Sequence, residues 1–290
     1  MFRLLVLVVA ACVAVCTAAP LEKWSTYKNA PDLKPQLGAL AERMYGRPDN
    51  STGERVAKYD PKTDTINPEE LGSYAAGDIL VPGMLGRNGL VATSSRWSRG
   101  RIPFMISTDI APQYVDIIYQ AMNVYHELTC VRFVPWNGRD SDYVTIESSS
   151  SGCWASVGRI GGRQSVNLQA PACLAKVGTV LHELMHTVGF LHEQNRAERD
   201  QYVDILWENV EKGREENFKK ISASIAFSQI PYDYESVMHY STAAFSSNGK
   251  PTLRTKASGV RVGQRERMSV GDIHKINMMY KCDGPYSYVQ

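Results

Sequence analysis

The chain has 290 residues, enough for one large domain with appended segments and for a substantial buried core. Its 32 lysines and arginines nearly balance its 30 aspartates and glutamates, which leaves a formal net charge of +2. Such balance gives no reason to expect a nucleic acid or a charged membrane surface as a partner.

Residues 1–18 have the pattern of a secretory signal peptide. Arg3 precedes an apolar stretch over 4–15, and small residues follow it up to Pro20, which argues against cleavage directly before it. Twelve apolar residues are too few to span a bilayer, which needs about 20. No later stretch is long and apolar enough either, so we predict a secreted, extracellular protein without a membrane anchor.

Cysteine usage agrees with secretion. Two of the six cysteines lie in the signal segment, and the other four are Cys130, Cys153, Cys173 and Cys282. An even number in an oxidising compartment predicts two disulfides, and four cysteines allow three pairings among which the sequence does not choose. A cysteine metal site is the alternative, but the short spacings typical of such sites are absent.

Residues 19–87 differ in composition from the rest of the chain. Prolines recur among many charges and few apolar runs, so we do not expect this segment to fold alone. Asn50-Ser51-Thr52 is an N-glycosylation acceptor, which we expect in an exposed loop. The segment is either a linker or a propeptide.

A folded domain begins near residue 96. Short apolar and β-branched runs predict strands over 102–107, 131–135, 143–147 and 165–168. Apolar residues at helical spacing predict helices over 113–128, 177–188 and 269–280, and a charged stretch over 211–220 predicts a solvent-facing helix. Regular elements are interleaved before residue 190 and sparse after it. We therefore expect an α+β domain of two lobes with the active cleft between them.

The most informative stretch reads His-Glu-Leu-Met-His-Thr-Val-Gly-Phe-Leu-His over 182–192. His182 and His186 are four residues apart, so on a helix their rings project from one face. A continuing helix could not bring His192 to the same ion, but Gly189 can take a left-handed conformation that ends the helix. Three imidazoles suit one Zn²⁺ per chain and leave its fourth position open, as in catalytic sites.

Glu183 follows the first of these histidines and is placed to take a proton from a zinc-activated water. The alternative is a core helix with incidental histidines, but the glycine and the third histidine at fixed offsets argue against it. The stretch therefore predicts a catalytic zinc site with Glu183 as its general base.

Two longer motifs extend this pattern. Residues 193–200 read Glu-Gln-Asn-Arg-Ala-Glu-Arg-Asp, and residues 236–240 read Ser-Val-Met-His-Tyr. With the histidine stretch they closely resemble the long signature and the Met-turn of the astacin family of metzincin metallopeptidases. One position departs, since Glu198 stands where the family usually has Asp, with the same charge. The resemblance covers about residues 74–282 and implies a two-lobed metzincin fold and a monomeric zinc endopeptidase that acts on peptides or proteins.

The resemblance also implies roles around the metal. The phenol of Tyr240 would contact zinc at rest and donate to the developing oxyanion; a packed aromatic is the alternative. Met238 would form an apolar floor under the metal. The region of Trp154 would form the upper rim of the cleft and an edge strand, with which an extended substrate pairs antiparallel. The implied disulfides are Cys130–Cys282 and Cys153–Cys173.

A latent precursor is implied by Ala76-Gly77-Asp78-Ile79, which resembles the aspartate switch of astacin propeptides. Asp78 would then bind zinc in the zymogen only. The family's aromatic residue before this motif is replaced by Ala75, with Tyr74 next to it.

Counting back from the start of the domain, a trypsin-like protease would cleave after Arg87 and release a catalytic domain over 88–290. The new amine of Asn88 would then pair with Glu193 inside the domain; a solvated surface glutamate is the alternative.

Arg265 lies in a loop whose arginines, in astacins that prefer acidic residues just after the scissile bond, reach into the receiving pocket. A guanidinium can hold a carboxylate bidentately, so we expect Arg265 to favour Asp or Glu at that position. Arg261 and Arg267 are close in sequence and either add to the field or face water. A structural surface arginine is the alternative.

A catalytically silent secreted binding or matrix protein of the same fold is the rival hypothesis. Such a protein should have lost its general base or a metal ligand, whereas Glu183, the three histidines and Tyr240 are all present. The sequence therefore favours the enzyme.

Overall fold

The computed structural model describes residues 47–80, 95–221 and 230–283, so the signal segment, Arg87 and Asn88 lie outside it. Within these ranges no helix combines the length and apolar character needed to cross a membrane. The helices are α2 (Asn50–Val56), α3 (Val115–Leu128), α4 (Val177–Val188) and α5 (Val270–Tyr280). The strands are β1 (Arg101–Ile106), β2 (Arg132–Pro135), β3 (Tyr143–Glu147), β4 (Cys153–Ala155), β5 (Arg163–Leu168), β6 (Val203–Ile205) and β7 (Leu253–Thr255).

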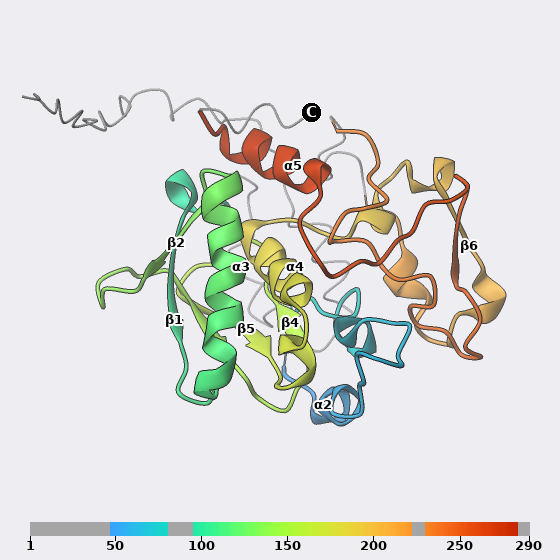
Figure 1. Cartoon of the computed structure of the whole chain (residues 1–290), viewed down its shortest axis with the longest axis horizontal. Helices are drawn as coiled ribbons and strands as arrows, with labels where there is room; N and C mark the ends of the chain where they lie inside the picture. The colour runs from blue at the N-terminus through green and yellow to red at the C-terminus, as the bar shows by residue number, and fades with distance from the viewer. Residues whose placement is uncertain (1–46, 81–94, 222–229, 284–290) are drawn as a thin grey trace, which may run out of the picture.

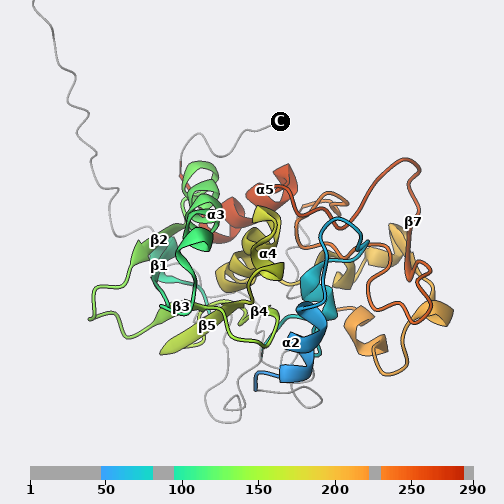
Figure 2. The same ribbon diagram turned by 60° about the horizontal axis from the view of Figure 1, so that its bottom comes forward.

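Residues 95–190 form what we call the sheet lobe. Its five strands follow the order β2-β1-β3-β5-β4, all parallel except β4, which pairs antiparallel with β5 and forms an edge. Helices α3 and α4 lie side by side on one face of this sheet (Figures 1 and 2). The hydroxyl of Tyr125 on α3 donates to the carbonyl of Leu181 on α4 at 2.7 Å. The sheet and the buried face of α3 therefore fix the position of α4, which carries His182 and His186.

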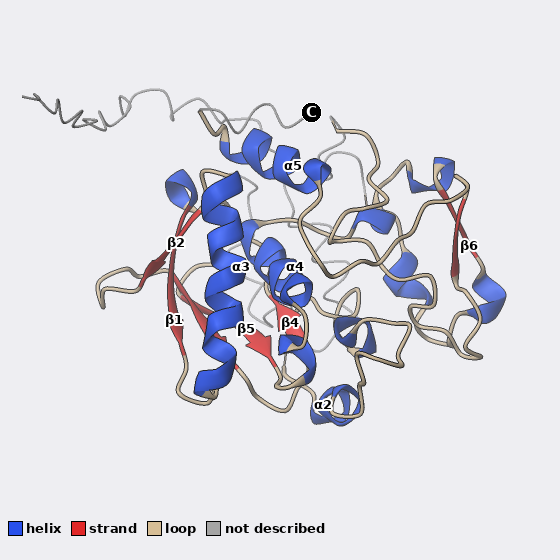
Figure 3. Cartoon of the chain, viewed as in Figure 1, coloured by secondary structure: helices blue, strands red, loops and turns tan. Residues whose placement is uncertain are grey.

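Residues 191–283 form the coil lobe, in which loops prevail (Figure 3). Among its described residues, β6 and β7 form a two-stranded sheet, and Val210 and Ser246 form an isolated β-bridge. The helix expected over 211–220 is wrong, because only Glu215–Phe218 is helical, as a short 3₁₀ turn. Gly213 has φ +89°, which a right-handed helix does not accommodate. Phe218 is fully buried against Tyr240 and turns this stretch towards the core of the lobe rather than towards solvent.

Helix α5 returns the chain from the coil lobe to the sheet lobe. It begins after Ser269, whose side chain accepts a hydrogen bond from the N–H of Asp272. The hydroxyl of Tyr280, its last residue, donates to the carbonyl of Val188 at 2.7 Å. Cys130–Cys282 fixes the chain just beyond the helix, and Cys153–Cys173 ties β4 to the turn before α4. The structure thus contains both disulfides that the family resemblance implied.

Residues 47–80 pack against both lobes, and Figure 2 shows α2 and the segment after it running between β4 and the coil lobe. Asn50 is exposed, but it is the first residue of α2 rather than part of a loop, so that expectation is wrong. Its neighbour Asp49 caps the helix by accepting from the N–H groups of Ser51 and Thr52. Val56 is fully buried in the main core, which explains how a segment with few apolar residues becomes folded.

Candidate active site

Helix α4 and the turn after it position the three histidines. All of α4 from Gly178 onwards is buried, so His182 and His186 point from the helix into the protein rather than into solvent. Gly189 ends the helix with φ +127°, a conformation that favours glycine, and its N–H donates to His186 O at 2.9 Å. The chain then reverses and brings His192 back to the same point, as the sequence predicts.

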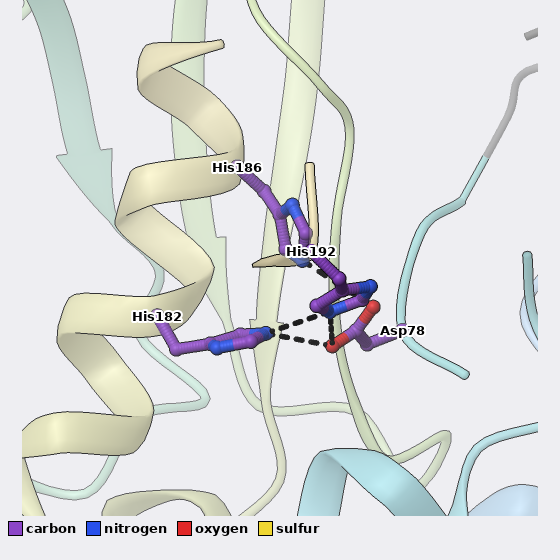
Figure 4. A group of neighbouring side chains, drawn as sticks. All are labelled: Asp78, His182, His186 and His192. Atoms are coloured by element: carbon purple, nitrogen blue, oxygen red, sulfur yellow. Dashed lines mark hydrogen bonds and ion pairs between the residues drawn. The ribbon is translucent and has the colours of Figure 1, made fainter. Parts of the chain in front are cut away.

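Asp78 of the preceding segment meets these histidines (Figure 4). Its Oδ2 lies 2.9 Å from Nε2 of His182 and 3.2 Å from Nε2 of His192, and its Oδ1 lies 3.3 Å from Nε2 of His186. The four ligand atoms all lie within 4.8 Å of one another. Ligands about 2.0–2.1 Å from a tetrahedral zinc ion are separated by about 3.3 Å, so the observed spacing suits one such ion.

The imidazoles of His182 and His186 are held in the form that binds a metal, whereas Nδ1 of His192 has no hydrogen-bond partner. Nδ1 of His182 lies 2.7 Å from the carbonyl of Val237, and Nδ1 of His186 lies 2.7 Å from the carbonyl of Phe190. A carbonyl only accepts, so each Nδ1 carries the proton and each Nε2 keeps its lone pair. Burial also lowers the pKa of His182 and of His192 to about 4, which leaves both rings neutral at pH 7.

Unpartnered polar atoms at this point indicate a missing partner. Both carboxylate oxygens of Glu183, Oδ1 of Asp78 and Nε2 of His186 are buried without a hydrogen bond. Buried polar atoms are normally satisfied, so such a concentration needs an explanation. A zinc ion among the histidines and Asp78 would satisfy Oδ1 of Asp78 and Nε2 of His186, whereas Glu183 lies outside this ligand group. Burial raises the pKa of Glu183 well above its usual value, and the Asp78 carboxylate raises it further.

Comparisons with known proteins agree with this geometry. A family model described as Astacin, a peptidase family, matches residues 90–281. The chain is 41% identical over 242 residues to the zinc metalloproteinase nas-4 of Caenorhabditis elegans, covering 78% of this chain and 76% of nas-4. The chain belongs to the astacin family. It is therefore a zinc metalloendopeptidase of α+β metzincin fold.

Two further proteins are similar in sequence to this astacin. It is 37% identical over 217 residues to the human meprin A subunit beta, covering 73% of this chain but only 30% of that protein. The high choriolytic enzyme 1 of the medaka fish Oryzias latipes, described as a hatching enzyme zinc-protease, is 36% identical and superimposes with a TM-score of 0.62. That match covers 68% of this chain and 99% of the medaka chain.

In this astacin the phenol of Tyr240 is engaged by residue 76 rather than free. Its hydroxyl donates to the carbonyl of Ala76 at 2.5 Å, and its ring packs 4.7 Å from that of His192. The backbone N–H of Tyr240 donates to the side chain of Gln194 at 3.0 Å, a contact that the sequence did not suggest. Met238 is 1% exposed and lies in the main core, and its role as an apolar floor under the metal stays a prediction.

The segment containing Asp78 also covers the edge of the sheet. Ala155 of β4 donates its N–H to the carbonyl of Asp78 at 2.9 Å and accepts from the N–H of Leu80 at 3.0 Å, so the segment runs parallel to β4. Tyr74 is fully buried, lies edge-on to Trp154 at 6.1 Å and donates its hydroxyl to the carbonyl of Ser151 at 2.7 Å. Tyr74 therefore provides the aromatic anchor that Ala75 lacks.

A second contact of this segment involves Arg265. The guanidinium forms a fully buried ion pair with Glu69 and donates to the carbonyl of His239 at 3.1 Å. Glu70 accepts from both the N–H and the hydroxyl of Ser241, each at 2.6 Å. The roles of Glu69 and Glu70 were not predicted, because two acidic residues in a charged segment form no recognisable motif. Arg267 pairs instead with Glu235 at the surface, and Arg261 is exposed.

Glu193 lies in the interior and is not a solvated surface residue. Its carboxylate is 2.6 Å from Nζ of Lys275 and 2.8 Å from Nη1 of Arg196. Burial opposes its ionisation, but these two cations hold the pKa of Glu193 below its usual value. Arg196 also pairs with Glu198, the residue that departs from the usual family pattern.

Proposed function

We propose that this protein is the latent precursor of a secreted zinc endopeptidase, in which Asp78 occupies the metal position that catalysis requires. The observation that supports this most directly is the approach of one buried carboxylate to all three histidines. Burial opposes ionisation of Asp78, and the neutral imidazoles around it carry no charge to offset this, so its carboxylate needs a cation such as zinc at this point.

The chemistry would be divided between the metal and two side chains, Glu183 and Tyr240. When bound, zinc would polarise the scissile carbonyl and lower the pKa of water. Glu183 would take the proton from the attacking water and deliver it to the leaving amine, a role suited to a carboxyl whose pKa burial raises. Tyr240, which donates to the carbonyl of Ala76 in the uncut chain, would donate to the substrate carbonyl oxygen as negative charge develops on it.

The orientation of the propeptide supports its role as an inhibitor rather than a substrate. Residues 78–80 pair parallel to β4, whereas a substrate strand is expected to pair antiparallel with the same edge. Because this segment runs in the opposite direction to the expected substrate, it presents the side chain of Asp78 to the histidines instead of a peptide carbonyl. It therefore fills the cleft without offering a bond for hydrolysis.

Activation would follow cleavage after Arg87 by a trypsin-like protease, and removal of the preceding segment would uncover several groups together. Asp78 would leave the histidines, Ala76 would release Tyr240, and Tyr74 would uncover Trp154 for substrate binding. Arg265 would lose Glu69 and become free to receive an acidic side chain just after the scissile bond. N-terminal sequencing of the active species, with a start at Asn88, tests this step.

The catalytic assignment is tested with the processed enzyme. Glu183→Gln removes the general base while keeping size and polarity, so hydrolysis of a peptide should fall by about 10²–10⁴-fold with zinc content unchanged. His192→Ala removes a ligand instead and should lower the amount of bound zinc. Near-normal turnover by metal-loaded Glu183→Gln protein would exclude the mechanism, and full zinc retention by His192→Ala would exclude that ligand.

A further inference from the structure

Lys275 lies on α5, and its ammonium group is paired in the interior of the protein rather than exposed to solvent. Its side chain is 5% exposed, and its Nζ donates to Oε2 of Glu193 at 2.6 Å. An ammonium group buried to this degree is stable only when it is paired. Burial opposes its charged form, but the carboxylates of Glu193 and Asp272 raise the pKa of Lys275 above its usual value.

Glu193 has a complete set of partners in the uncut chain. Besides Lys275, it accepts from Nη1 of Arg196 at 2.8 Å and from the N–H of Asp233 at 2.9 Å. Within the described ranges, the buried atoms without a partner include both carboxylate oxygens of Glu183 but no atom of Glu193 or Lys275. The metal site therefore still has groups that await a ligand, whereas the surroundings of Glu193 have none.

Glu193 connects Lys275 with the third histidine. Glu193 directly follows His192, and its N–H donates to the carbonyl of Met238 at 3.1 Å. The carboxylate of Glu193 is therefore held in part by α5, and its backbone is held by the Met-turn. This arrangement limits the positions that His192 can adopt.

The preceding turn of the same helix acts on the first histidine. Asp272 accepts from the N–H of Val237 at 2.8 Å and from the hydroxyl of Ser236 at 2.6 Å. The carbonyl of Val237 in turn accepts from Nδ1 of His182 at 2.7 Å. One face of α5 thus supports two of the three histidines, since Asp272 and Lys275 are three residues apart.

We propose that Lys275 is a positioning residue of the zinc site, which supplies from α5 the positive charge that fixes Glu193 and His192. The amine created by cleavage is then not needed for a working site, unlike the partnership of Asn88 with Glu193 that the family resemblance suggests. The inference rests on the proposed function, but it concerns the retention of zinc as well as activity. Groups next to a metal ligand typically change metal affinity or activity by roughly 10–100-fold when removed.

The first experiment changes the new N-terminus. Two full-length precursors carry a specific protease site whose cleavage yields a chain starting either at Asn88 or with three extra residues before it. We expect kcat/KM and the rate of zinc loss to a chelator to agree within about twofold. A tenfold or greater defect of the extended chain in either quantity would overturn the inference. If neither chain hydrolyses peptides, the proposed function fails, and zinc loss still decides the inference.

The second experiment changes Lys275 itself, with Lys256→Met as the control. Lys256 forms a surface ion pair with Asp204 at 3.3 Å, and this pair is far more exposed than the buried pair of Lys275 and Glu193. Lys275→Met should release zinc roughly 10–100-fold faster and lose a comparable factor in kcat/KM. Lys275→Arg keeps the charge and should recover most of both. Equal zinc release by Lys275→Met and Lys256→Met would contradict the positioning role.

A folding defect does not prevent a decision. The double variant Glu193→Gln/Lys275→Met removes both charges of the pair, while Arg196 keeps its contact with Glu198. If Lys275→Met does not fold, this variant should fold and still release zinc faster than the wild type. Zinc release at the wild-type rate would show that the buried pair serves stability alone and would overturn the proposal.

Discussion

The segment before the catalytic domain contacts the cleft at two places that differ in kind. At Asp78 its carboxylate lies among three histidines, and atoms of both partners remain without hydrogen bonds. At Glu69 and Glu70 its carboxylates bind Arg265 and Ser241 of the coil lobe, so that carboxylates meet a cation and hydrogen-bond donors of the protein, although Oε2 of Glu69 and Nη2 of Arg265 have no hydrogen bond. The first contact occupies a catalytic position, whereas the second fixes the segment at a distance. Latency and attachment can therefore be tested separately.

The largest effect is expected from Asp78→Ala in a chain that cannot be processed because it also carries Arg87→Ala. Loss of one partner from a buried charged cluster typically costs about 3–5 kcal/mol. If the uncut chain keeps roughly 1% of the activity, the state in which the segment covers the cleft is favoured by only about 2.7 kcal/mol. We therefore expect the peptidase activity of the uncut chain to rise by about 100-fold, measured with a fluorogenic peptide.

Glu54→Gln is the matched control for this experiment, since Glu54 is an exposed acidic residue of α2 in the same segment. It should leave the residual activity unchanged. If Asp78→Ala stays as inactive as this control, the segment blocks the cleft without acting on the metal position, and the contrast between the two contacts disappears.

A smaller effect is expected from Glu69→Gln in the same uncleavable chain. Glutamine keeps a hydrogen bond to Arg265 but loses the charge, and charge-assisted hydrogen bonds are about twice as strong as neutral ones. We expect residual activity to rise by about tenfold, or about 1.4 kcal/mol. An effect as large as that of Asp78→Ala would show that attachment and latency are one property.

The sequence predicted the sheet lobe and the metal site better than the coil lobe. The boundaries of α4 and β3 match the predicted ones because periodicity and β-branched runs mark elements that pack on a common core. The helix expected over 211–220 failed, since charge suggested solvent while Phe218 is fully buried. In a lobe with few backbone ladders, single aromatic contacts decide the path of the chain, and no periodicity reveals them.

The same difference explains which site residues the sequence identified. His182, His186 and His192 belong to one local pattern whose spacing has a chemical meaning. Lys275 and Glu193 are 82 residues apart, and their contact depends on how α5 returns to the sheet lobe. Glu69 meets Arg265 across 196 residues. Pairing at such separations is a property of the tertiary fold, so the sequence alone did not predict it.

The smallest predicted effect concerns the specificity of Arg265 once the segment before residue 88 has been removed, as we propose. The ion pair with Glu69 shows that the guanidinium of Arg265 can bind a carboxylate from another chain segment. We expect an acidic substrate residue just after the scissile bond to take the place of Glu69. Exposed ion pairs contribute up to about 1 kcal/mol, so Arg265→Ala should lower the kcat/KM ratio of acidic to neutral peptides by roughly fivefold. Arg267→Ala is the control, because Arg267 pairs with Glu235 at the surface.

Arg265 also donates to the carbonyl of His239, beside Tyr240, so a structural role predicts a different result. Loss of that contact would disturb Tyr240 and weaken hydrolysis of acidic and neutral peptides equally. Loss of a substrate contact would act on acidic peptides alone. The ratio of the two kcat/KM values separates these roles even if both absolute values fall. A wild-type preference for small apolar residues at that position would exclude Arg265 as the specificity residue.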